Sequence, residues 1–265
     1  GFSQTVSRPE FRELTPLRFI QPRGLRTVVG NPDLEQAAIR SFDLRWEWFR
    51  RPGEVLAASV FLKRLRDPIE LVSFFAGGRT FVQPVNYPQG EVRGAEVEAR
   101  IPLGAADTAL HGLVLGVNAG VIHSEVDVPA QEQASLSTFG LDEPTRRLQG
   151  QPSYLFNANL SWDFDGIGAS GGLFYNVAGD SLLTSASTGD TGGVPNVFMT
   201  SFRTLDFSYT QKLVRSKLDL SMTLKAKNLY QSERRTVFRS PDGQEIIKSL
   251  RDTAITYGLS FNLKW

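Results

Sequence analysis

Apolar and polar side chains alternate along this chain with a period of two, and the alternation recurs in one segment after another. In residues 255–265 every odd position is apolar or aromatic, whereas the even positions hold Thr, Gly, Ser, Asn and Lys. Successive side chains of a β-strand point to opposite faces, so each such segment would have one apolar and one polar face. Residues 41–48 and 217–227 repeat the pattern. The sequence therefore predicts an all-β protein.

The alternation predicts about ten strands with connections of two kinds. The strands are predicted at 1–7, 37–50, 54–66, 91–102, 109–125, 152–163, 166–179, 198–213, 216–229 and 252–265. Most reach the ~9–11 residues that a tilted strand needs to cross a bilayer. The connections alternate between short ones at 51–53, 103–108, 164–165 and 214–215 and long ones at 8–36, 67–90, 126–151, 180–197 and 230–251. Short turns at one end and long loops at the other are typical of an antiparallel, meandering transmembrane β-barrel, with periplasmic turns and extracellular loops.

The polar face of the predicted strands is too highly charged for a dry core, so we expect it to line a wet lumen while the apolar face meets lipid. Trp46, Trp48, Trp162 and Trp265 lie near strand ends beside the short turns, where an interfacial aromatic belt is expected. The predicted lipid face includes Phe42, Leu44, Trp46, Leu113, Leu115, Leu160, Leu220, Leu224, Leu259 and Phe261. With 29 basic and 28 acidic residues, the chain lacks the basic excess of a nucleic-acid-binding protein.

Several short motifs occur in an ordered series along the chain. They are Gly30–Leu34, Trp46–Trp48, Arg51–Leu56, Asp67–Glu70, Gly94–Arg100, Leu148–Tyr154 and Lys227–Tyr230, followed by a terminal strand that ends in Trp265. Each motif is weak alone, but their order and spacing resemble the C-terminal part of the barrel of TonB-dependent outer-membrane receptors. The resemblance covers essentially the whole chain.

This resemblance implies a bacterial outer-membrane location and a larger, 22-stranded barrel that is closed by an N-terminal plug. It also implies TonB-dependent uptake of a scarce nutrient such as an iron–siderophore chelate, with a small-molecule ligand and the TonB complex as partners, the latter through the plug. Residues 1–265 would then be the C-terminal portion of the barrel, because no plug and no further strands are found in them.

Two alternatives remain open from the residues alone. An open sheet in lipid leaves unpaired backbone groups at both edges, so ten strands must either close on themselves or belong to a larger barrel. Ten is an even number that a closed barrel permits, and a self-closed passive pore is therefore the first alternative. An outer-membrane rim protease is the second and weaker one, since only His123 with Glu125 approaches a catalytic arrangement. We expect no enzyme activity, no metal site and no cofactor.

Three groups of residues are candidates for function. Basic side chains in the first and last long loops, with one histidine near the outer rim, are candidate contacts for an anionic ligand or for lipopolysaccharide phosphates: Arg18, Arg23, Arg26, His123, Arg234, Arg235 and Arg239. The C-terminal run of Tyr257, Leu259, Phe261, Leu263 and Trp265 resembles the terminal signal that the barrel-assembly machinery recognises in outer-membrane proteins. Outer-membrane lipid is the remaining expected partner.

Overall fold

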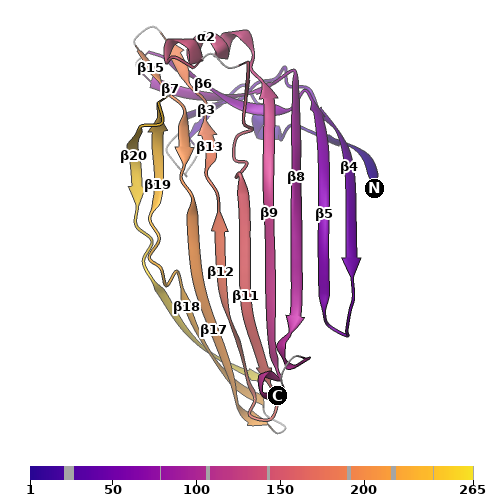
Figure 1. The fold of residues 1–265 in the computed structure, drawn as a ribbon. Coiled ribbons are helices and arrows are strands. Elements are labelled where there is room, and N and C mark those ends of the chain that lie inside the picture. Colours follow the sequence, from indigo (N-terminus) through magenta and orange to yellow (C-terminus); the bar gives the residue numbers. More distant parts are fainter. Residues whose placement is uncertain are drawn as a thin grey trace.

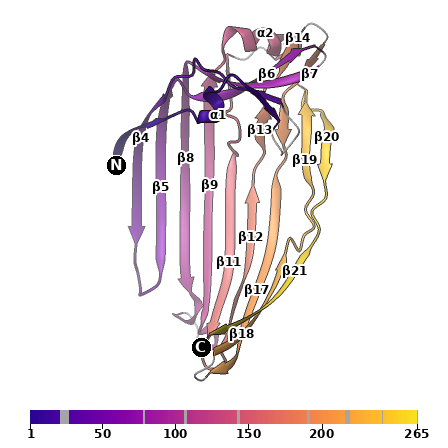
Figure 2. The same ribbon diagram turned by 180° about the vertical axis from the view of Figure 1, so that it is seen from behind.

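A tall, curved antiparallel sheet forms a wall, and a layer of smaller elements covers one of its ends (Figures 1 and 2). The computed structural model describes residues 1–20, 27–77, 79–105, 108–141, 144–189, 192–215, 219–240 and 242–264. The wall contains, in spatial order, β1 (Phe2–Ser7), β4 (Ala37–Trp48), β5 (Val55–Arg66), β8 (Gln89–Pro102), β9 (Leu113–Asp127), β11 (Tyr154–Phe164), β12 (Ala169–Ala178), β17 (Phe202–Arg215), β18 (Asp219–Lys227) and β21 (Thr256–Lys264). These correspond one for one to the strands that the alternation predicts, which confirms an all-β antiparallel meander.

The register of the wall carries one apolar face across neighbouring strands. Leu44 pairs with Val60, which pairs with Ala95, and the row continues through Val121 to Tyr154. The predicted lipid-facing residues all share this face, with Leu44 exposed by 70% and Phe261 by 62%. Large apolar side chains exposed in such number require a partner other than water.

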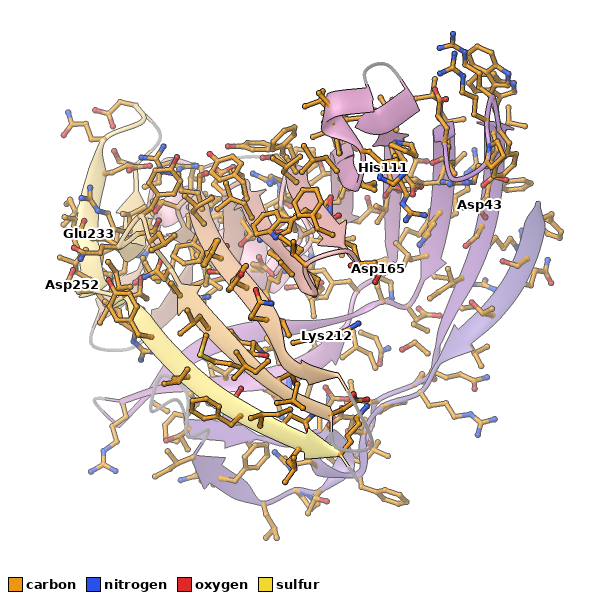
Figure 3. The ribbon with its side chains drawn as sticks, turned by 90° about the horizontal axis from the view of Figure 1, so that it is seen from below. Asp43, His111, Asp165, Lys212, Glu233 and Asp252 are labelled. Atoms are coloured by element: carbon orange, nitrogen blue, oxygen red, sulfur yellow. The ribbon has the colours of Figure 1, made fainter. Side chains whose placement is uncertain are left out.

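The opposite face of the wall is polar and lies on the concave side. Figure 3 looks along the wall from its short-turn end and shows Lys212 of β17 directed into the hollow of the curve. Ser124 and Val126 belong to the same face of β9, and both are buried where the loop layer folds over it. The concave face is therefore the inner one, in agreement with the expectation of a wet lumen.

The wall is an open arc. Its strand order runs from β1 to β21 without returning, and the described residues contain no pairing between these two end strands. The chain therefore does not close on itself as a ten-stranded barrel in this structure. Among the described residues, neither helix is long and apolar enough to cross a membrane.

The long connections, expected as loops, contain secondary structure of their own. One sheet of four strands joins β13 (Ser181–Thr184), β16 (Val197–Met199), β19 (Arg234–Arg239) and β20 (Glu245–Arg251). A six-stranded sheet joins β15 (Gly192–Val194), β14 (Ser187–Gly189), β6 (Ile69–Ala76), β7 (Arg79–Asn86), β3 (Thr27–Val29) and β2 (Arg18–Ile20). With helices α1 (Phe11–Leu14) and α2 (Ala130–Thr138), and the two-residue strand β10 (Thr145–Arg146) beside β9, they form what we call the loop layer.

Several predicted boundaries were wrong by a few residues. The strand predicted at 109–125 begins only at Leu113, after two short 3-10 turns (Leu103–Ala105 and Thr108–Leu110), so His111 precedes it. The segment predicted as one strand at 198–213 is divided, because Val197–Met199 belongs to the loop layer and β17 begins at Phe202. The errors fall where the wall meets its connections, since alternation alone does not mark where pairing stops.

Candidate functional site

The inner wall carries a row of amide and charged side chains across several strands. Glu98 of β8 pairs in register with Asn118 of β9, and Asn118 pairs with Asn157 of β11. Arg45 of β4 donates to Glu98 over 2.8 Å and to Glu47 over 2.7 Å. This face therefore offers both hydrogen-bond donors and acceptors to a polar solute.

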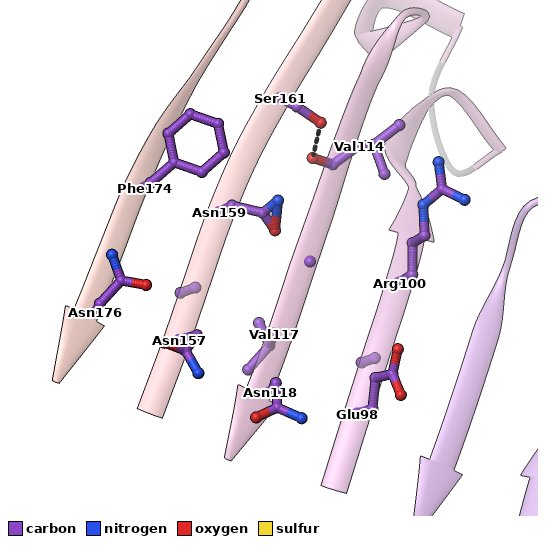
Figure 4. A pocket seen from close by; sticks show the side chains of 13 residues that line it. Glu98, Arg100, Val114, Val117, Asn118, Asn157, Asn159, Ser161, Phe174 and Asn176 are labelled. Atoms are coloured by element: carbon purple, nitrogen blue, oxygen red, sulfur yellow. Dashed lines mark hydrogen bonds between the residues drawn. The ribbon is translucent and has the colours of Figure 1, made fainter. Parts of the chain in front are cut away.

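A hollow of about 410 Å³ lies on this face between β8 and β12 (Figure 4). Polar side chains line it, including Glu98, Arg100, Asn118, Asn157, Asn159 and Asn176. Gly116 makes room for one of them, because a Cβ at this position would lie 2.0 Å from Oδ1 of Asn159. The absence of a side chain on β9 thus lets the Asn159 amide lie flat across the neighbouring strand.

A buried ionic network joins three parts of the loop layer. Arg146 of β10 donates through Nε to Glu132 of α2 over 2.7 Å and through Nη1 to Glu70 of β6 over 2.8 Å. The Tyr87 hydroxyl also donates to Glu132, and the guanidinium of Arg146 lies 4.8 Å from the centre of the Tyr87 ring. The side chains of Arg146 and Glu132 are only 6% and 1% exposed.

Burial controls the ionisation of this network. It raises the pKa of Glu70, although the charge of Arg146 acts in the opposite direction. Burial also raises the pKa of the Tyr87 hydroxyl. Burial alone would lower the pKa of Arg146, but Tyr87, Glu132 and Glu70 outweigh it and raise that pKa. The guanidinium is therefore a fixed positive charge that holds two acids from different connections together.

A second ionic cluster links the loop layer to the top of the wall. Asp180, which follows β12, accepts hydrogen bonds from Arg239 of β19 over 2.9 Å and from Ser153 over 3.1 Å. Arg147 lies 3.4 Å from the same carboxylate, and Arg239 also contacts Glu245 at 2.7 Å. Partial burial opposes ionisation of Asp180, but the hydrogen bonds of Arg239 and Ser153 outweigh it and lower its pKa.

The motifs Asp67–Glu70 and Leu148–Tyr154 meet at the Arg146 network. The backbone N–H of Gln149 donates to Glu70 over 3.1 Å, and the Gln149 side chain exchanges hydrogen bonds with the backbone of Leu71 at 2.6 and 3.2 Å. In a third motif, Asn228 adopts a left-handed backbone (φ 58°) and its side chain donates to the Thr253 carbonyl over 2.6 Å. These motifs therefore hold connections to one another and to the wall.

The structure places the predicted basic residues in separate parts of the loop layer. The guanidinium of Arg18 lies 5.0 Å from the centre of the Phe81 ring, and that of Arg234 lies 4.4 Å from the Phe202 ring. Arg235 pairs with Glu233, while Arg239 belongs to the Asp180 cluster. Arg23 and Arg26 lie outside the described residues.

His123 lies on the outer face of β9, away from the inner hollow, and hydrogen-bonds Glu125 over 2.6 Å. Tyr257, Leu259, Phe261 and Leu263 share the outer face of β21, whereas Trp265 lies outside the described residues. Ligand contact and the assembly signal both stay predictions. Across the described residues, no three His, Asp or Glu side chains lie close enough together to hold a metal ion.

The Arg146 network was missed from the sequence. Its members are 14 to 76 residues apart, and each taken alone looks like an ordinary solvated loop charge. The only signal was indirect, since Glu70 ends one quoted motif and Arg146 lies just before another.

Comparison with known proteins gives consistent matches. The family model described as "TonB dependent receptor-like, beta-barrel" matches residues 1–229. The iron-regulated outer membrane virulence protein of Vibrio cholerae serotype O1 is 28% identical over 171 residues, which are 61% of this chain and 23% of that protein.

Solved structures share the fold at low sequence identity. A variant of the ferric enterobactin receptor PfeA of Pseudomonas aeruginosa superposes with a TM-score of 0.60 and 18% identity, covering 99% of this chain and 37% of that one. The copper transporter OprC has a TM-score of 0.61 and 12% identity, covering 99% of this chain and 36% of that one. The chain thus spans under two fifths of these relatives, and the structural likeness supports the fold alone.

Proposed function

The chain belongs to the TonB-dependent receptor β-barrel family, and from this premise we propose that it is the C-terminal portion of the barrel of an outer-membrane receptor for a scarce nutrient. The family model that matches residues 1–229 describes the β-barrel of TonB-dependent receptors. In this proposal residues 1–265 supply the wall described above, and the plug and the remaining strands lie in parts of the protein outside this chain.

The open arc with opposite faces is the observation that carries the proposal. An exposed apolar outer face suits lipid, and an inner face with Arg45, Glu98 and a row of asparagines suits a water-filled lumen. The free outer edges of β1 and β21 would be costly in hydrocarbon, and further strands would satisfy them. Neither a self-closed pore nor a rim protease gains support, because the end strands do not pair and His123 faces outward.

We propose an iron–siderophore chelate as the nutrient. Two relatives support this class, one described as an iron-regulated outer membrane protein and one as a ferric enterobactin receptor. Arg18 and Arg234, whose guanidinium groups lie over aromatic rings, would attract an anionic chelate, whereas Arg235 and Arg239 are paired with acids. A copper transporter shares the fold equally well, so the fold does not distinguish between these nutrients. A measurement of uptake must do so.

The proposal also sets the orientation and the partners. The loop layer would face the medium, and the short turns and the C-terminus would face the periplasm, where the plug engages the TonB complex. The apolar face of β21 would be recognised by the barrel-assembly machinery through strand pairing. Deleting residues 261–265 from the complete protein should then leave periplasmic, protease-sensitive chain; normal outer-membrane levels would contradict this role.

Uptake of radiolabelled iron by a strain that lacks the gene for the complete protein tests the function. Restoring the gene should restore uptake of a ferric catecholate chelate, and removing TonB or collapsing the proton gradient should abolish it. Uptake that persists without TonB would indicate a passive pore. Uptake of copper but not of the chelate would keep the receptor and replace the nutrient.

A further inference from the structure

A belt of arginines lies on the outer face of the wall, at the end that carries the loop layer. It consists of Arg40 on β4, Arg64 and Arg66 on β5, and Arg93 on β8, and we call it the arginine belt. Arg40 pairs in register with Arg64, so their side chains stand side by side on one face. The three strands that carry the belt, β4, β5 and β8, are neighbours in the wall, as Figure 1 shows.

The belt is exposed and only partly neutralised. The side chains of Arg64 and Arg93 are 67% and 62% exposed, and they share one acid, Glu91, at 3.8 and 3.9 Å. Arg40 and Arg66 are exposed and have no acidic partner within ion-pair distance among the described residues. The nearby Glu125 is engaged by His123 instead. Four guanidinium groups therefore stand against two carboxylates, Glu91 and Glu125, and His123 also contacts the second of these.

The apolar face begins directly beneath the belt. Phe42 and Leu62 lie in the same cross-strand row as Arg93, and the next row toward the short turns is Leu44 with Val60. Successive rows thus change from guanidinium to hydrocarbon within one or two residues. This arrangement matches an amphiphile with an anionic head and acyl chains rather than a soluble anion.

We propose that the arginine belt binds the phosphate groups of lipopolysaccharide while the rows below it pack against the acyl chains. Guanidinium groups are suited to this ligand because their planar donors bind phosphate oxygens in pairs. The belt cannot serve the transported nutrient, because its side chains point away from the inner wall. The choice of lipopolysaccharide rests on the proposed orientation, in which the loop layer and the belt lie on the outer-leaflet side.

Native mass spectrometry of the complete detergent-solubilised protein, titrated with diphosphorylated lipid A, tests the proposal. The variant R40Q/R64Q/R66Q/R93Q should bind this lipid more weakly by on the order of tenfold, and added salt should weaken binding to the unaltered protein. The matched control K63Q/R100Q/K225Q/K227Q removes the same number of charges from the inner face, and its binding should be unchanged. Dephosphorylated lipid A should bind the unaltered protein and the belt variant equally.

A third variant, R40K/R64K/R66K/R93K, keeps the charge but loses the paired donors, so it should bind diphosphorylated lipid A more tightly than the glutamine variant does. This comparison separates a loss of charge from misfolding of the glutamine variant. Equal binding of diphosphorylated lipid A by the belt variant and the unaltered protein would overturn the proposal, as would an equal loss in the inner-face control. The readout is lipid binding and not uptake. A failure here therefore leaves the proposed transport function standing, and a failure of transport leaves this result standing.

Discussion

The wall and the loop layer differ in how much of their apolar side chains they expose. In the wall, Leu44 is 70% and Tyr257 74% exposed, and the hydrogen-bonded ladder between strands supplies the order. In the loop layer, Tyr87 is fully buried and Val237 is 1% exposed, as in a protein that folds in water. The wall therefore leaves a whole apolar face to lipid, whereas the loop layer has a buried centre of its own, although Ile246 and Ile247 of β20 stay exposed at its surface.

Charges differ between the two regions in the same way. The inner wall keeps its ions solvated, with the side chains of Arg45 and Glu98 each 42% exposed. The loop layer instead buries Arg146 with Glu70 and Glu132. A buried pair becomes costly when one partner is lost, whereas an exposed pair does not. The loop layer should therefore respond strongly to single charge changes that the wall tolerates.

The largest effect is expected at Arg146. R146M would leave Glu70 and Glu132 buried without a cation, and the loop layer should lose about 3–5 kcal/mol of stability. Hydrogen exchange should show lost protection in β6, β7 and α2, with the wall strands unchanged. The triple variant E70Q/E132Q/R146M removes the uncompensated charges and should recover much of the loss. Full protection in R146M alone would show that the network is not a stabilising link.

The next effect concerns the two faces of the wall. Leu224 and Thr223 are adjacent on β18 but point to opposite faces. L224R at the lipid face should cost roughly 2–4 kcal/mol in an unfolding titration in vesicles, because a charge enters hydrocarbon. T223R on the inner face should cost far less. Equal losses in the two variants would mean that the faces are assigned incorrectly.

A smaller effect is expected at Asp180, where the loop layer meets the wall. D180N removes the acceptor charge for Arg239 and should cost about 1–3 kcal/mol. Because the pKa of Asp180 is lowered on folding, its contribution is fully present above the ordinary aspartate pKa of about 3.9 and is lost as the pH falls through the lower folded value. Unfolding midpoints measured from pH 7 down to pH 3 should therefore converge for D180N and the unaltered protein.

The smallest effect is expected at the exposed pair of Glu233 with Arg235. Their side chains are 39% and 51% exposed, so E233Q should change stability by about 0–1 kcal/mol. Added salt should erase even this difference. A loss as large as that in R146M would mean that burial does not separate the two kinds of ion pair.

The wall could be predicted from the sequence, whereas the loop layer could not. Strands of 9 to 15 residues, such as Leu113–Asp127, show alternation over enough positions to be recognised. In Ile69–Ala76 apolar side chains occur at odd and even positions, because this strand is covered on both faces, and several loop-layer strands have only three residues. The motifs signalled the family, but the contacts that they make, such as Gln149 with Glu70, arise only after distant connections have met.

The pairing of every wall strand with its neighbours in chain order has a consequence for the kinetics of assembly. Each hairpin can form from residues close in sequence, so the wall can grow one strand at a time with a small loop-closure entropy at each step. In the proposed complete barrel, joining the outer edge of β21 to the first strand is different, because these two strands lie far apart along the chain. The closing of that seam would be the slow step, and until it is complete the backbone groups along the outer edge of β21 would stay unpaired.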